Sequence, residues 1–123
     1  MKKIITIIKS NMKTLKQHAD DVFKNKDMPT KLADVLVKMN QDYGELCDDL
    51  LPIERKKMDF WLEHKDAYAE KPISDKTVEA MWLQKGDGVL ERRMEMYKKA
   101  LEKMMSNVKA ILREKENQAR NLH

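Results

Sequence analysis

The sequence predicts an all-α fold: a helical hairpin or bundle of four to five helices in one domain, ending in a long helix with a heptad pattern. Two observations predict it. Apolar residues recur every three or four positions along most of the 123 residues, which is the spacing of one helix face. The chain also has only three glycines and three prolines, so it lacks the turn residues that a sheet of several strands requires.

The first helix is predicted over residues 2–25. Its apolar row consists of Ile4, Ile8, Met12, Leu15, Ala19 and Val22. The β-branched opening of the row leaves a short strand at residues 4–8 as the alternative. Because the residue before a proline avoids the helical region, the helix should end before Pro29, and Thr30 is the expected N-cap of the next helix.

Residues 30–85 form the helical middle of the chain. Its first apolar row consists of Leu32, Leu36, Met39, Tyr43, Leu46 and Leu50. Pro52 should either kink this helix or open the next one, which spans roughly residues 53–70. The next apolar row is expected to consist of Met58, Trp61, Leu62 and Tyr68. Lys71-Pro72 should close that stretch.

A short helix follows, for which Ser74 is the expected N-cap. It carries Val78, Met81 and Trp82, and Gly86 is expected to end it in a left-handed C-terminal cap. The glycines at 86 and 88 are too close together to form a phosphate-binding loop.

The long C-terminal helix is predicted over residues 89–119, about 45 Å at roughly 1.5 Å per residue. Its seam follows three heptads and consists of Leu90, Met94, Tyr97, Leu101, Met104, Val108 and Ile111. A row of this length needs a continuous partner, either another helix in a long hairpin or a second subunit. The remaining helices are expected to be shorter, so we predict a homo-oligomer held partly by this seam.

Charge is unevenly distributed, although the net charge is only +4. Residues 1–31 carry eight basic and three acidic side chains, whereas residues 32–54 carry one basic and six acidic ones. Within the first helix, Lys9, Lys13 and Lys16 fall on one face, opposite the apolar row. Such a face can follow a phosphate backbone, lie on an anionic membrane, or keep the helix solvated.

A second basic group consists of Arg55, Lys56 and Lys57, with Phe60 after it. Single-stranded nucleic acid is bound by basic side chains beside aromatic rings on which bases stack. Phe60 lies off the apolar row predicted for this stretch, so it is the expected stacking residue, while Trp61 and Trp82 are expected in the core. The competing interpretation of this segment is ordinary packing.

Catalytic motifs are absent from the sequence. It contains no phosphate-binding loop, dinucleotide-binding glycine motif or zinc-protease motif, so no catalytic residue, cofactor or enzymatic activity is expected. The single cysteine, Cys47, favours a reducing compartment and is expected to be buried. No apolar run is long enough to span a bilayer.

An acidic group within residues 32–54 could act in three ways. Its members are Asp42, Glu45, Asp48 and Asp49. They could form a solvated face, dock against the basic first helix, or contribute to a metal site. Histidine partners at metal-ligand spacing are missing, so no metal is predicted.

The second half of the chain resembles a known family. The motifs are Asp75-Lys76-Thr77-Val78-Glu79-Ala80, then Val89-Leu90, Tyr97, Leu101 and Ser106-x-x-Lys109-Ala110-Ile111. Over roughly residues 74–123 they resemble UvsY, the recombination mediators of T-even-type bacteriophages. The resemblance implies a small helical protein that forms a ring-like homo-oligomer, binds single-stranded DNA and helps load a recombinase onto strands covered by single-strand-binding protein. It also matches Arg55-Lys56-Lys57 to the family's mid-chain basic stretch, where Trp61 and Glu63 then depart from the family pattern.

From the residues and the resemblance together we expect a non-enzymatic oligomeric accessory protein that binds single-stranded DNA in recombination or replication. The expected site consists of Lys9, Lys13, Lys16, Arg55, Lys56, Lys57 and Phe60. The expected partners are single-stranded nucleic acid and a recombinase or other protein, in the cytoplasm and without a membrane. The alternative is a helical adaptor or inhibitor that binds another protein through its methionine-rich seam.

Overall fold

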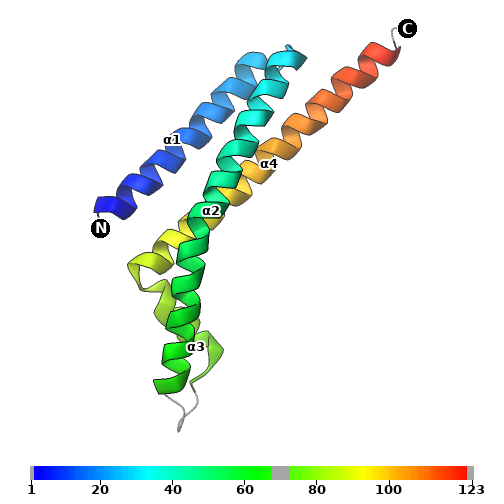
Figure 1. Ribbon diagram of the computed structural model, residues 1–123. Coiled ribbons are helices and arrows are strands. Elements are labelled where there is room, and N and C mark those ends of the chain that lie inside the picture. Colours follow the sequence, from blue (N-terminus) through cyan, green and yellow to red (C-terminus); the bar gives the residue numbers. More distant parts are fainter. Residues whose placement is uncertain (1, 68–72, 122–123) are drawn as a thin grey trace.

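A computed structural model describes residues 2–67 and 73–121, and it confirms the all-α prediction. Within these residues the chain forms four helices and no strand: α1 (Lys2–Asn25), α2 (Pro29–Ala67), α3 (Asp75–Leu83) and α4 (Gly86–Asn121). Figure 1 shows α2 and α4 as a long antiparallel pair, with α1 beside one half of the pair and α3 beside the other half. The expected chain closure at Lys71-Pro72 lies outside the described residues.

The boundaries of α1 and α2 differ in detail from those expected. The chain is helical through residues 4–8, so the strand alternative is wrong. The Met28 amide donates to the Asn25 carbonyl at 2.9 Å, which closes the turn between the helices. Pro29 then occupies the first turn of α2, where its missing N–H leaves no bond unmade, so the helix starts before Thr30 and Thr30 is not its N-cap.

Helix α2 is continuous through Pro52 and has 39 residues. The sequence allowed a new helix to begin at this proline, and the structure excludes that alternative. A proline within a helix removes one backbone hydrogen bond. Here the nearby residues Leu50 and Ile53 are 2% and 7% exposed, so packing holds the helix together across the missing bond.

Helix α3 begins at an N-cap and is joined to α4 by a short connection. The Ser74 hydroxyl accepts a bond from the Thr77 amide at 3.2 Å, which confirms Ser74 as the N-cap of α3. Gly86 is not a left-handed cap, because no glycine in the described part of the chain has a positive φ. It is instead the first residue of α4. The close approach is at Gly88, where an added Cβ would stand 2.0 Å from the Trp82 carbonyl oxygen.

Two apolar clusters form the core along the α2–α4 pair. The α1-end cluster consists of Leu32, Val35, Met39, Leu101, Met105 and Val108. The α3-end cluster consists of Leu46, Leu50, Ile53, Phe60, Val78, Trp82, Leu90 and Met94. Helix α1 packs on the α1-end cluster through Leu15 and Val22, and its start reaches the α3-end cluster through Ile7 and Ile8.

The heptad seam of α4 therefore lies inside the chain. Leu90, Met94, Leu101 and Val108 are buried, and Tyr97, Met104 and Ile111 pack partly buried against the same clusters. The hairpin alternative is the correct one, and this seam is not available to a second subunit. Helix α2 proves long enough to be the continuous partner. Beyond Leu112, α4 extends past the clusters with its side chains in solvent apart from a partly covered Lys115.

A polar contact also joins the two long helices. The Tyr43 hydroxyl of α2 donates to Glu102 Oε1 of α4 at 2.7 Å. This hydrogen bond, followed by partial desolvation and the charge of Glu102, raises the pKa of Tyr43 from 10.0 to about 12. The contact favours the protonated phenol, so its contribution to stability is complete below pH 10.0 and is lost as the pH rises through about 12.

We expect the ultraviolet absorbance of Tyr43, identified by difference against Tyr43→Phe, to titrate near pH 12. Glu102→Gln removes the carboxylate that opposes ionisation, so it should move this titration back toward pH 10.0. An unchanged midpoint in the Glu102 variant would show that the hydrogen bond does not form.

Two glycines give a matched pair of stability predictions. Gly44 lies within α2 with open space around an added Cβ, so Gly44→Ala should raise the free energy of unfolding by about 0.5–1 kcal/mol. Gly88→Ala drives a methyl group into the Trp82 backbone and should lower it by about 1–3 kcal/mol. Urea denaturation of both variants checks the opposite signs, and equal effects would contradict the close contact at Gly88.

Candidate functional site

The outer face of α1 carries the basic row that the sequence predicts. Lys9, Lys13 and Lys16 are exposed, on the side of α1 away from Leu15 and Val22, which pack on the core. Within the described residues none of the three lysines forms an ion pair or a hydrogen bond. One helix face therefore carries three lysines without an ion-pair partner, and the exposed Asp20, four residues after Lys16, lies on the same face.

An exposed aromatic ring lies two helical turns after Lys16. Phe23 is 71% exposed, and the Nζ atom of Lys26 stands 4.8 Å from its ring centroid. Seven residues separate Phe23 from Lys16, which places them on the same side of the helix. Met12 of the same helix is also exposed, at 57%. The sequence contains a signal for Phe23, because this residue falls outside the apolar row of α1, but the expected site did not include it.

Phe60 is a core residue, so its expected role in base stacking is wrong. It is 5% exposed, and its ring centroid lies 3.9 Å from that of His64 and 5.4 Å from that of Trp82. Trp61, expected in the core, is only partly buried, whereas Trp82 is buried as expected. The buried row of α2 includes Ile53 and Phe60, which are seven residues apart and therefore lie on the same helix face.

The basic group at residues 55–57 is divided among three environments. Lys57 donates to Glu79 at 3.3 Å and to Glu91 at 3.2 Å. Burial lowers the pKa of Lys57, but these two hydrogen bonds outweigh burial and leave the pKa above 10.5. Lys56 lies 3.8 Å from Asp87, and only Arg55 is exposed without a partner in the described structure. The three residues therefore do not form one phosphate-binding patch.

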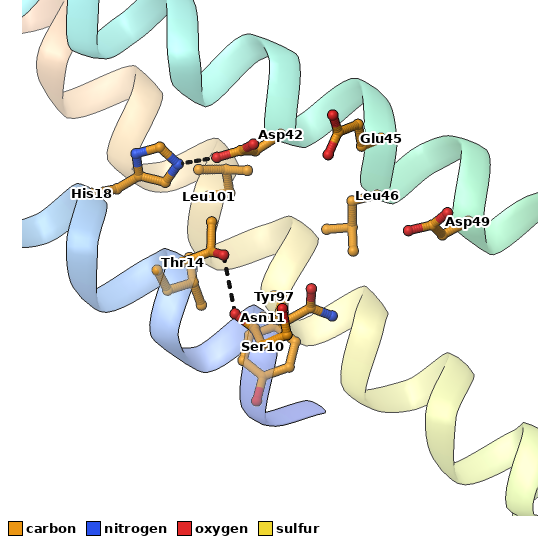
Figure 2. Close-up of a pocket in the computed structure, with 11 residues that line it drawn as sticks. Ser10, Asn11, Thr14, His18, Asp42, Glu45, Leu46, Asp49, Tyr97 and Leu101 are labelled. Carbon is orange, nitrogen blue, oxygen red and sulfur yellow. Dashed lines mark hydrogen bonds and ion pairs between the residues drawn. The ribbon is translucent and has the colours of Figure 1, made fainter. Parts of the chain in front are cut away.

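A cavity of about 180 Å³ lies between α1, α2 and α4, and Figure 2 shows its lining. His18 of α1, which is 5% exposed, directs Nε2 at Asp42 Oδ2 of α2 at 2.5 Å. Glu45 and Asp49 follow along α2 on the same wall. The acidic segment thus docks on α1 as one alternative expected, but it does so through a histidine and not through the lysine row.

The contact with Asp42 sets which ring nitrogen of His18 carries the proton. Its Nε2 faces a carboxylate and is therefore the donor, while Nδ1 is buried without a partner. Asn11 Nδ2 is also buried without one. Among the described residues no group of three or more histidine, cysteine or acidic side chains could hold a metal ion. The histidine–carboxylate contact fixes α1 against α2.

Comparisons with known proteins identify no relative. No protein-family model, no curated protein and no solved structure matches this chain. The described helices include none that is long and apolar enough to cross a membrane. The exposed face of α1, defined by Lys9, Lys13, Lys16 and Phe23, is a candidate binding surface.

Because Lys56 and Lys57 lie in different environments, replacing each by methionine should affect the free energy of unfolding unequally. Lys57→Met leaves Glu91, whose side chain is 13% exposed, without its cation and should lower the free energy of unfolding by about 1–3 kcal/mol. Lys56→Met removes an exposed contact and should cost no more than about 1 kcal/mol. Chemical denaturation at low salt separates them, and equal losses would contradict the assignment.

Proposed function

We propose that this chain is a non-enzymatic accessory protein that binds single-stranded nucleic acid along the outer face of α1. The observation that carries the proposal is the row formed by Lys9, Lys13 and Lys16, which is exposed and has no ion-pair partner among the described residues. The exposed ring of Phe23 follows this row two turns further along the same helix. The proposal keeps the lysine part of the expected site and replaces Phe60 by Phe23.

Electrostatics supports a polyanionic ligand for this face. Because the lysines have no acidic partner among the described residues, binding a phosphate breaks no existing ion pair. Each phosphate that a lysine neutralises releases condensed counterions, so affinity falls as salt rises. Glu45 and Asp49 belong to α2 and line the inner cavity, whereas Asp42 lines a hollow together with Lys13. The exposed carboxylate of Asp20 lies on the lysine face and offsets part of its charge, so the face keeps a smaller net positive charge.

The exposed aromatic ring supports a single-stranded ligand. A ring held at a helix surface can stack on an unpaired base, which is worth about 1–3 kcal/mol and does not depend on base identity. In a duplex the bases are stacked on each other and offer no free face. In the wider proposal, drawn from the resemblance to recombination mediators, the bound strand is one onto which a recombinase is loaded.

The second candidate function is a helical adaptor that binds another protein. A hollow of about 330 Å³ between α1 and α4 favours it, since its lining is mainly apolar: Ala19, Val22, Phe23, Lys26, Met104, Asn107 and Ile111. Phe23 belongs to both surfaces, so its loss alone does not distinguish the two functions. The salt dependence of binding does distinguish them.

We expect the full chain to bind single-stranded oligonucleotides at low ionic strength with an affinity that falls steeply as salt is added. Replacing Lys9, Lys13 and Lys16 by alanine should flatten the slope of log affinity against log salt by about two units, at roughly 0.7 per phosphate. Helicity should be preserved, because alanine is a good helix former. Fluorescence anisotropy across a salt series provides the measurement.

The matched control replaces three exposed basic residues of α4, Lys99, Lys103 and Arg113, by alanine. It changes the net charge equally and should leave the slope close to that of the wild type. Phe23→Ala should weaken binding without changing the slope, because stacking releases no counterions. Absence of salt-dependent binding by the wild-type chain would refute the proposal and leave the adaptor function in its place.

A further inference from the structure

Helix α2 has a second apolar row on its outer side. Val37, Gly44, Leu51 and Met58 follow one another at intervals of seven residues, and Leu62 continues the row. The exposed fractions of Val37, Leu51, Met58 and Leu62 are 54%, 50%, 62% and 56%. At 100° per residue this outer row lies opposite the buried row of Leu46, Ile53 and Phe60. One long helix therefore carries an apolar row on each of two opposite faces, and the described residues cover only the inner one.

Two charges interrupt the outer row in a symmetric way. Asp48 stands three residues before Leu51 and Arg55 four residues after it, on the same face. Both are exposed, and in the described part of the chain neither has an ion-pair partner. The two charges have opposite signs and lie at nearly equal distances from Leu51. Two copies of this row are therefore electrostatically complementary when they run antiparallel.

We propose that the outer row of α2 binds a second copy of this chain, with the two α2 helices antiparallel and a two-fold axis beside Leu51. The two Leu51 side chains meet at the axis. Asp48 of each copy faces Arg55 of the other copy, so the same ion pair forms twice. Met58 of each copy lies over Gly44 of the other, where an added Cβ would have no neighbour within 4 Å and a large side chain finds room.

The charges select this arrangement over the parallel one. A parallel pair in register places Asp48 on Asp48 and Arg55 on Arg55, and like charges at a contact are unfavourable. The antiparallel pair turns both repulsions into attractions. Its contact is symmetric about Leu51 and runs over residues 40–62, about 33 Å at roughly 1.5 Å per residue. It uses no residue of the α1 face, so it is independent of nucleic-acid binding.

The first test is the oligomeric state of the full chain. Sedimentation equilibrium should show a concentration-dependent dimer, and Leu51→Glu should weaken it at least tenfold. The matched control is Met96→Glu, which places the same charge on a residue of α4 that is 54% exposed and should leave the dimer unchanged. A wild-type monomer throughout the concentration range, or equal weakening by both variants, would overturn the proposal.

Charge reversal tests the pairing. Asp48→Arg and Arg55→Asp should each weaken the dimer at least tenfold, because each variant sets like charges against each other twice. The double variant restores opposite charges at both contacts and should return the dissociation constant to within a few-fold of the wild-type value. A double variant as weak as the single ones would contradict the pairing of these residues.

Cysteine cross-linking tests the direction of the helices. In a Cys47→Ser background, Leu51→Cys places two thiols at the two-fold axis and should give a disulfide-linked dimer under mild oxidation. Met58→Cys in the same background places its thiols 14 residues apart along the pair, about 21 Å, and should stay reduced. Efficient cross-linking at both positions indicates parallel helices and would refute the proposal.

Discussion

The burial of the α4 heptad row against α2 is the interaction on which the rest of the structure depends. Most of the stability of each helix comes from packing of its apolar face and little from helix propensity. Each buried leucine or methionine of the row contributes about 1.5–3 kcal/mol. The pair is longer than a single compact core, and so α1 and α3 each cover a different part of it. This arrangement also determines which surfaces are exposed. The apolar face of α1 packs on the α2–α4 pair, so its lysines lie on the face turned toward solvent.

The periodicity of the sequence was sufficient for the fold class, the limits of α1 and the cap at Ser74. It was insufficient wherever two rows lie on one helix. On α2 the residues Met58 and Leu62 form a plausible row and so do Ile53 and Phe60, and local spacing does not say which row is covered. The row of Ile53 and Phe60 is the buried one because α3 packs against it and places Trp82 on Phe60. The expected site inherited this ambiguity, because the stacking residue was chosen as the aromatic outside the wrong row.

Charge was similarly incomplete as a guide. Residues 55–57 form one basic run in the sequence, but in the structure Lys57 contacts Glu79 and Glu91 of two other helices, and no local pattern reveals such a contact. His18 carried no signal in the sequence, yet it fixes α1 to α2 through Asp42. Lysines 9, 13 and 16 were placed correctly because exposure on a helix face opposite an apolar row is a local property.

The end of α4 that projects beyond Leu112 has a different physical character from the rest of the bundle. Its tertiary support is the contact of Lys115 with Asp27 at 3.6 Å, and its local support includes the Glu116–Arg120 pair at 2.8 Å. Both contacts are electrostatic, and salt screens them. These turns therefore behave as a peptide in a helix–coil equilibrium, whose helical fraction follows temperature and ionic strength. Their backbone amides exchange with solvent by fraying, without global unfolding of the chain.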